Sequence, residues 1–251
     1  MKLAGYRGRT GTAGAAVSGA TQEPAPLDAV LDGAARLQEL VPGAVFVGDS
    51  AAAYHAGHRL SFDHDHVVAD LAARYDTVLS TLEALDDWST ARVAGGKLIL
   101  GELAGIETGV RQMVRRRPLE VEDVPLGHRV LRVPTLEEIL RIKAWLVVTR
   151  NRTRDYLDAA ALSDRIGTHR AGRVLAGIDE FYAEVNRRPE AVATQVARQF
   201  ADPAPRDPSV TSRLASYKRL DPRWHDWAAV VAALRQVAVA MVGGGDPEAE
   251  P

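Results

Sequence analysis

The chain has 251 residues, with 31 Lys and Arg against 33 Asp and Glu, a net charge of -2 and no cysteine. The missing cysteine excludes a disulfide framework, a thiolate zinc site and a cysteine nucleophile. No apolar run reaches the roughly 18 residues of a membrane span, and residues 1–26 lack the apolar core of a secretion signal. We therefore expect a cytoplasmic protein that does not contact a membrane.

The spacing of apolar residues divides the chain into a mixed N-terminal part and a helical C-terminal part. The first part is predicted to contain helix 27–40, strand 44–47, helix 50–58, strand 60–68, helix 74–85 and strands 88–93, 97–103, 106–114 and 130–133. Thr135 and Glu138 then have the spacing of a capping box. The helices expected after them are 135–150, 153–165, 170–185, 189–200, 209–219 and 224–241.

This pattern predicts four segments and an α+β fold class. Residues 1–26 and 243–251 are rich in small or polar residues and are expected to be flexible tails. Residues 27–134 are expected to form an α/β core, and residues 135–242 a helical domain that completes the active site. The boundary between the two is predicted near Pro134.

The segment from Ser61 to Val68 contains the alternating sequence Asp63-His64-Asp65-His66. In a strand, Ser61, Asp63 and Asp65 would share one face and both histidines the other. Two carboxylates about 7 Å apart on one face repel each other, and a divalent cation relieves that repulsion. Mg²⁺ binds one or two carboxylates together with phosphate oxygens. The alternative is a solvated edge strand whose aspartates face water.

A second pattern, Val47-Gly48-Asp49-Ser50, lies shortly upstream. A strand that runs through a glycine into a helix start directs backbone N–H groups at one point, which suits a phosphate. An ordinary strand–turn–helix connection capped by serine has the same sequence.

Lys143 lies in the middle of the apolar stripe of the helix expected at 135–150. Buried lysines need a partner, so Lys143 is predicted to pass between core residues and bind a phosphate. The alternative is a lysine at the edge of the stripe that extends to solvent. On the next helix Asp155 and Asp158 share a face, where one of them would lie beside Lys143 or the metal. A solvated helix start explains these two aspartates equally well.

Two other groups have simple alternatives. The histidines at 55, 58, 64 and 66 suggest zinc, but strand alternation turns His64 and His66 away from the aspartates, so core positions are expected. A basic cluster would either follow an RNA backbone or form a solvated loop; it consists of Arg111, Arg115, Arg116 and Arg117.

These motifs together resemble the AbiEii and MenT-type nucleotidyltransferase toxins over residues 44–165. The matching residues are Gly48-Asp-Ser50, His58-Arg59-x-Ser61-x-Asp63-x-Asp65, and Lys143 followed by Arg150 and Arg154-Asp155-Tyr-x-Asp158. The resemblance implies a polymerase-β-like nucleotidyltransferase core with a mixed sheet, followed by an all-α C-terminal region.

The resemblance also implies an activity. Such enzymes transfer NMP from an NTP to an acceptor, which in the best-understood relatives is the 3′ end of tRNA, and this blocks translation. The implied cofactor is Mg²⁺, with Mn²⁺ as an alternative. The implied partners are tRNA and a cognate antitoxin protein, with no DNA.

Site roles carry over by position as what the resemblance implies. Asp63, Asp65, Lys143 and Asp155 would be catalytic, with Asp63 and Asp65 as metal ligands. The nucleotide would contact Gly48, Ser50, Ser61, Lys143 and Arg150, and the further candidates are Asp158, Arg59 and Glu107. Glu107 lies in the stretch where a third strand carboxylate is expected.

The chain departs from the family at Asp49, where a second small residue is usual. A negative charge near a triphosphate is unfavourable unless it is paired or faces away. Two alternatives to the toxin stay open: a nucleotidyltransferase that acts on a small molecule or a protein, and a catalytically degenerate nucleotide-binding module, which Asp49 favours.

Overall fold

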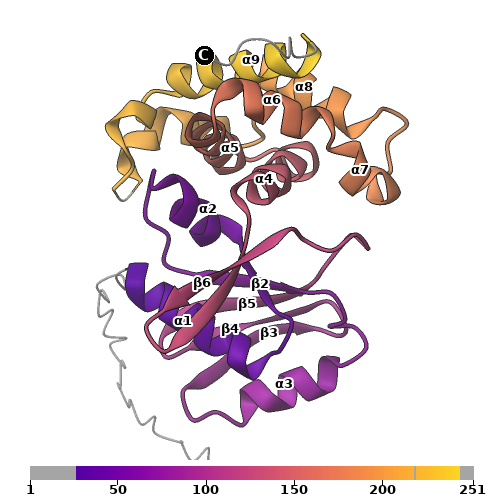
Figure 1. Ribbon diagram of the computed structural model, residues 1–251. Coiled ribbons are helices and arrows are strands. Elements are labelled where there is room, and N and C mark those ends of the chain that lie inside the picture. Colours follow the sequence, from indigo (N-terminus) through magenta and orange to yellow (C-terminus); the bar gives the residue numbers. More distant parts are fainter. Residues whose placement is uncertain (1–26, 218, 244–251) are drawn as a thin grey trace, which may run out of the picture.

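The last strand ends at Pro134 and helices follow it, as Figure 1 shows for residues 27–217 and 219–243, the part of the chain that the computed structural model describes. The tails predicted at 1–26 and 243–251 lie outside the described residues, apart from Gly243. The fold is α+β with a mixed sheet and a helical C-terminal part, which confirms the predicted fold class.

In the N-terminal part, helices and strands alternate as far as the third helix, and five consecutive strands follow. Its elements are α1 (Leu27–Leu40), β1 (Val45–Val47), α2 (Gly48–Ala56), β2 (His64–Val68), α3 (Tyr75–Glu83), β3 (Trp88–Ala94), β4 (Leu98–Leu103), β5 (Ile106–Gln112), β6 (Val121–Leu126) and β7 (Arg129–Pro134).

Among the described residues after Pro134 all elements are helical, and those labelled η are 3-10 helices. These elements are α4 (Leu136–Arg150), α5 (Thr153–Ile166), α6 (Thr168–Ala176), α7 (Asp179–Tyr182), η1 (Ala183–Val185), α8 (Val192–Ala201), η2 (Pro208–Ser216), η3 (Pro222–Trp224) and α9 (Trp227–Val242).

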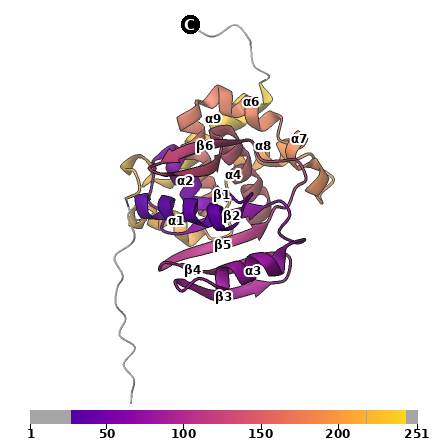
Figure 2. The same ribbon diagram turned by 60° about the horizontal axis from the view of Figure 1, so that its bottom comes forward.

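The main sheet has five strands in the order β1-β2-β5-β4-β3, which Figure 2 shows side by side. Strands β2 and β5 are parallel, and the other neighbours are antiparallel. The parallel register places Asp65 opposite Gly109 and Val67 opposite Arg111. Because register partners point to the same face, Asp65 and Arg111 share one side of the sheet.

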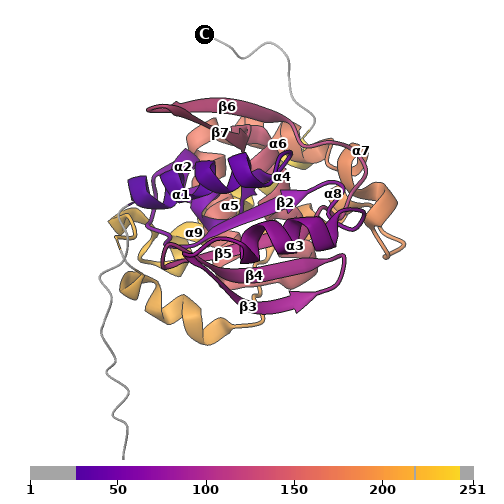
Figure 3. The same ribbon diagram turned by 90° about the horizontal axis from the view of Figure 1, so that it is seen from below.

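The two faces of β2 differ in burial. His64, His66 and Val68 are buried, while Asp65 and Val67 between them are partly exposed. The buried face is covered by α1 and α3 (Figure 3), and its core includes Leu37 of α1 and Leu82 of α3. The aspartate face is therefore the one that α1 and α3 leave uncovered.

A second and larger core extends across Pro134. It joins Leu31 and Ala34 of α1, Phe46 of β1 and Ala51 of α2 to buried residues of the C-terminal helices such as Leu157. The change from strands to helices near Pro134 is thus not a break in the packing. The division into separate domains stays a prediction.

Three predicted elements are shorter or divided. Strand 60–68 begins only at His64, because Ser50 and Ser61 donate side-chain hydrogen bonds to Asp63 and hold this segment outside the ladder. Helix 170–185 ends at Ala176 and continues as α7, and helix 209–219 is the 3-10 turn η2.

One strand was not predicted. The β6 sequence, Val121-Glu-Asp-Val-Pro-Leu126, is acidic and contains a proline, both unusual in strands. It forms a two-stranded ribbon with β7 and no other strand, and such an edge position tolerates the missing N–H of Pro125.

The capping box at Thr135 is only half formed. The Thr135 side chain accepts a hydrogen bond from the backbone N–H of Glu138, as predicted. The Glu138 carboxylate binds Arg115 and Arg141 instead of returning to the Thr135 N–H, which donates to the backbone oxygen of Glu120. The ion pairs of a buried glutamate thus take precedence over the local motif.

The crossing of α6 and α9 depends on Gly172. A Cβ at this position would lie 2.6 Å from the Cβ of Ala240, so we expect Gly172→Ala to lower the free energy of unfolding by about 1–2 kcal/mol through overpacking, net of its better helix propensity. Gly177→Ala is the matched control, because the nearest atom lies 3.8 Å away. Urea unfolding of both variants tests this, and equal stabilities would contradict it.

Candidate functional site

Two serines orient the first carboxylate of the predicted pair. Ser50 Oγ donates a hydrogen bond of 2.5 Å to the backbone oxygen of Asp63 and lies 3.3 Å from its Oδ1. Ser61 Oγ donates to the same Oδ1 at 2.7 Å. The structure therefore brings Ser50 and Ser61 together at Asp63, as the sequence predicts for residues around a shared site.

Two glycines flank the second carboxylate. A Cβ at Gly109 would lie 2.1 Å from Asp65 Oδ1, and one at Gly48 would lie 3.2 Å from Asp65 Oδ2. Gly48 also has a φ of +82°, which favours glycine. Asp65 thus lies in a cradle that larger residues at these two positions would fill.

Charges around Asp65 act in both directions. Burial raises its pKa, the Arg111 guanidinium opposes that rise, and the charges of Asp63 and Asp49 add to it, leaving the pKa above its ordinary value. Arg111 Nε lies 3.4 Å from Asp65 Oδ1. Like charges and burial therefore make a cation favourable here, and the partly exposed Arg111 supplies part of that positive charge.

The predicted lysine is completely buried between two carboxylates. Lys143 Nζ lies 2.6 Å from Asp49 Oδ1 and 2.7 Å from Asp158 Oδ2. Burial works against its charge, but Asp158 and Asp49 outweigh that effect, so the pKa of Lys143 lies above its ordinary value. Lys143 therefore does not extend to solvent, and its ammonium is held in the charged form.

Asp158 is the inner of the two carboxylates and has no solvent exposure. Besides Lys143 it accepts hydrogen bonds from Arg59 Nε at 2.9 Å and Arg59 Nη2 at 3.0 Å, and His58 Nε2 lies 2.8 Å from its Oδ1. Burial opposes its ionisation, but Arg59, Lys143 and His58 hold the pKa of Asp158 well below its ordinary value.

Asp49 is the outer carboxylate. Besides Lys143, Arg59 Nη2 lies 3.1 Å and Arg154 Nη1 3.4 Å from its Oδ2. Burial and the charge of Asp158 raise its pKa, but these three cations outweigh them and leave the pKa below its ordinary value. The departure at Asp49 is thus accommodated by pairing.

Asp155 lies beside this cluster without joining its hydrogen bonds. It is fully buried, and neither carboxylate oxygen has a hydrogen-bond partner among the described residues. Burial raises the pKa of Asp155 to about 6, although Lys143 lowers it. Asp155 and Asp158 share a helix face, as predicted, but only Asp158 binds Lys143.

The three residues Gly48, Asp49 and Ser50 connect the two groups of charges. Gly48 lies against Asp65, Ser50 donates to Asp63, and Asp49 binds Lys143. One turn at the start of α2 therefore places a carboxylate pair and a cluster of three cations next to each other.

The remaining candidates lie at different depths. Arg59 belongs to the cation cluster. Arg150 is exposed at the end of α4, where its charge lowers the pKa of Asp155. Glu107 is exposed on β5, on the same face as Gly109 and Asp65.

His64 and His66 are fully buried on the face opposite Asp65, as predicted. Within the described part of the chain, no group of three or more His, Cys, Asp or Glu is arranged to hold a metal ion. A histidine zinc site and a three-carboxylate site with Glu107 therefore receive no support from the geometry.

The basic cluster is divided between three environments. Arg115 is buried against Glu138, Arg117 lies over the ring of Phe181, and Arg111 faces Asp65. Only Arg115 is buried, so the cluster is not one continuous solvated loop, and contact of its exposed members with an RNA backbone stays a prediction.

The residues at the carboxylate pair fit Mg²⁺. The two carboxylates repel each other, and the glycines on both sides of Asp65 leave space next to its oxygens. Two carboxylates without further protein ligands match the preference of Mg²⁺ for sites that substrate phosphates complete.

Three features of this site were not predicted: the identity of the residues that pair with Asp49, the bond from His58 to Asp158, and the glycine at 109. The signal for His58 was its place beside Arg59 in the motif. Nothing in the local sequence indicates Gly109, since its role depends on the register between β2 and β5.

Sequence comparison links part of the chain to mycobacterial proteins named for transport. It is 38% identical over 130 residues to "Mycolic acid-containing lipids exporter MmpL11" of Mycolicibacterium smegmatis, a match that covers 51% of this chain and 13% of that protein. It is 37% identical over 130 residues to "Heme uptake protein MmpL11" of Mycobacterium tuberculosis, with the same coverage. The chain thus spans about an eighth of the length of these relatives.

No model of a known protein family matches the chain. Among solved structures it is similar to a provisionally assigned nucleotidyltransferase from H. pylori, with a TM-score of 0.44, 13% identity and coverage of 86% of this chain and 91% of the other. An antigenic nucleotidyltransferase-like protein from Paracoccidioides brasiliensis gives a TM-score of 0.41, 13% identity and coverage of 68% and 91%.

Among the described helices, none is both long enough and apolar enough to cross a bilayer.

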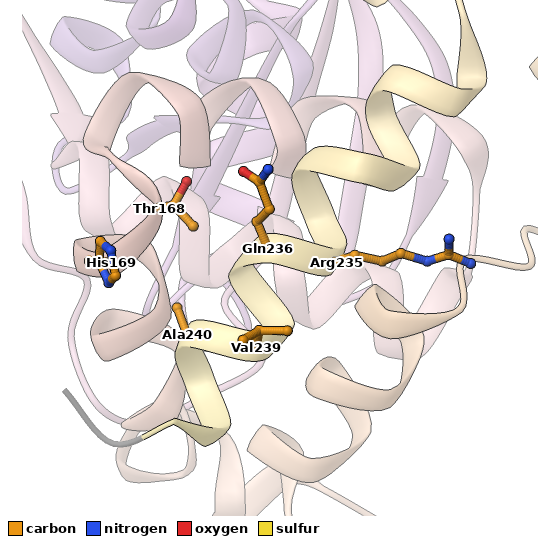
Figure 4. A pocket seen from close by; sticks show the side chains of 6 residues that line it. All are labelled: Thr168, His169, Arg235, Gln236, Val239 and Ala240. Atoms are coloured by element: carbon orange, nitrogen blue, oxygen red, sulfur yellow. The ribbon is translucent and has the colours of Figure 1, made fainter. Parts of the chain in front are cut away.

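A hollow of about 590 Å³ lies elsewhere, between α6 and α9 (Figure 4). It is lined mostly by apolar surface, and its residues are Thr168, His169, Arg235, Gln236, Val239 and Ala240. None of these belongs to the carboxylate pair or the cation cluster.

Asp155 predicts a pH-dependent stability. The pKa of Asp155 in the folded state, about 6, exceeds its ordinary value of 3.8, so between these pH values the folded state binds more protons than the unfolded state. The free energy of unfolding therefore falls as pH rises from about 4 to 6. Asp155→Asn removes this loss, so we expect it to be about 2–3 kcal/mol more stable than wild type above pH 7 and equal to it near pH 4.

Chemical denaturation at several pH values measures this difference. Asp164→Asn, a change of the same kind at an exposed aspartate of α5, controls for the substitution. A destabilised Asp155→Asn at pH 7 would show instead that an ionised Asp155 is bound by its neighbours.

Proposed function

We propose that this chain is a Mg²⁺-dependent nucleotidyltransferase that transfers NMP from an NTP to the 3′ end of tRNA and so acts as a translation-blocking toxin. The observation that supports it is the turn Gly48-Asp49-Ser50, which places the Asp63–Asp65 pair beside Lys143, Arg59 and Arg154. Nucleotidyl transfer needs this combination, because carboxylates hold a metal and cations stabilise phosphate charge.

In the proposed reaction, the acceptor hydroxyl oxygen forms a bond to the α-phosphorus, and the bond from that phosphorus to the bridging oxygen breaks. Pyrophosphate leaves, and the hydroxyl proton is released to solvent. Asp63 and Asp65 would hold Mg²⁺, which when bound neutralises phosphate charge and lowers the pKa of a hydroxyl. Ser50 and Ser61 keep Asp63 in one orientation, and the glycines beside Asp65 leave its oxygens accessible.

The choice of RNA as acceptor is supported by positive charge at the edge of the site. Arg150, Arg152 and Arg154 are exposed or half-exposed where α4 meets α5, and Arg154 reaches Asp49. A polyanion binding there would release counterions, so its affinity would fall steeply with salt. An acceptor that is a small molecule would show little such dependence. A cognate antitoxin protein and action in the cytoplasm follow from the toxin role.

A second candidate is a nucleotide-binding module without turnover. Two observations favour it: Asp49 already pairs with Lys143, and the described residues include no third carboxylate grouped with Asp63 and Asp65. Nucleotide binding without Mg²⁺-dependent transfer would distinguish this module from the enzyme.

Labelling of tRNA tests the proposal. Purified protein is incubated with total tRNA, Mg²⁺ and each α-labelled NTP separately. We expect label in tRNA with particular NTPs, and a loss of about 100-fold or more in Asp65→Asn, because one of the two metal-binding charges is removed. Asp70→Asn changes an exposed aspartate shortly after the same strand and should keep full activity.

No label in tRNA with any NTP, from a folded protein that binds NTP, would reject the tRNA acceptor. Label in another molecule of the reaction would favour a different acceptor with the same chemistry. Growth arrest on expression, absent for Asp65→Asn, is the expected result in cells.

A further inference from the structure

Asp158 and Asp49 both bind Lys143 and Arg59, but Asp158 does so from inside the protein and Asp49 from the more exposed side. Asp158 has no exposure and binds Lys143, both nitrogens of one side of the Arg59 guanidinium, and His58. These contacts fix Lys143 and Arg59 from inside the protein. Removing Asp158 would leave buried charges without a partner.

Asp49 contacts the same two cations from the other side, together with Arg154. The Asp49 side chain has a relative solvent exposure of 17%, and the Arg154 side chain one of 52%. A soluble anion could therefore reach the place of the Asp49 carboxylate, but not that of Asp158. If Asp49 were absent, Lys143 and Arg59 would still be held by Asp158.

The group that Asp49 resembles is a phosphate. Three cations converge on its carboxylate, with Lys143 at 2.6 Å, Arg59 at 3.1 Å and Arg154 at 3.4 Å. Lysine and arginine in this arrangement are the donors that recognise phosphate oxygens. The turn that carries Asp49 also touches Asp63 and Asp65, so the carboxylate lies where phosphates of a nucleotide bound at that pair would extend.

We propose that Asp49 is a built-in occupant of a phosphate-binding site formed by Lys143, Arg59 and Arg154, which phosphates or pyrophosphate enter only by displacing its carboxylate. The biological role of this site rests on the proposed function, since the bound Asp49 carboxylate would weaken NTP binding in the resting protein. The device is autoinhibitory: the carboxylate occupies the cations, and a ligand with more charge than one carboxylate replaces it.

Pyrophosphate binding without metal tests the inference. Titration calorimetry in EDTA is carried out on wild type, Asp49→Ala and Asp49→Asn. We expect both variants to bind pyrophosphate at least about tenfold more tightly than wild type, because a like charge is removed from beside the ligand. Asp164→Asn, which removes the partner of Arg223 at a distant surface, should bind like wild type.

A second substitution locates the binding. Adding Arg154→Gln to Asp49→Ala should remove most of the gain, since the half-exposed Arg154 would contact the anion. A gain that persists without Arg154 would place the anion elsewhere and reject the site.

Each other outcome also decides the matter. Folded Asp49 variants that bind pyrophosphate no more tightly than wild type would overturn the inference. Loss of folding in both variants would overturn it too, because a displaceable occupant cannot be required for folding. The assay involves no nucleotide transfer, so tighter binding combined with unlabelled tRNA would retain the site and reject the proposed function.

Discussion

The buried ion pair between the Lys143 ammonium of α4 and Asp158 of α5 is the contact on which the arrangement of these two helices depends, and Asp49 of α2 contacts the same ammonium from the more exposed side. Each of these helices supplies one of the three groups. A buried ion costs several kcal/mol unless well-placed partners compensate for it, so α4 and α5 cannot shift against each other without separating Lys143 from Asp158. The turn at Gly48 extends this constraint to the sheet, because it contacts Asp65 directly.

Two aspartates on α5 show how strongly position controls charge. Asp158 is surrounded by Arg59, Lys143 and His58 and is held in the ionised form, whereas Asp155, three residues earlier, has no hydrogen-bond partner among the described residues and is easily protonated. Environments that push the pKa values of neighbouring acids apart are typical of functional sites. Here the difference arises because the loop carrying His58 and Arg59 approaches only Asp158.

The sequence was informative where the contacts are local. Helical spacing located α1, α4 and α5, a short apolar run located β1, and the apolar stripe around Lys143 predicted that a charge would enter the core. The sequence could not show the partners of Asp49, because Lys143 and Arg154 lie about a hundred residues away along the chain and reach Asp49 only through helix packing. Gly109 was missed for the same reason: its role exists only in the register of β2 with β5. The ribbon strand β6 was missed because its proline and acids are tolerated by pairing on one side alone.

The larger hydrophobic core contains residues of α1, β1 and α2 as well as of the helices after Pro134. Two halves that share such a core differ from lobes joined by a hinge, whose interface is small and solvated. Rotation of one half against the other would separate apolar side chains that are now fully buried. Access to the carboxylates and to Lys143 would therefore come from motions of single side chains, and Arg111 and Arg154 are the partly exposed cations in contact with Asp65 and Asp49. Entry of a ligand to this site should accordingly be governed by rotamer exchange, which is much faster than domain closure.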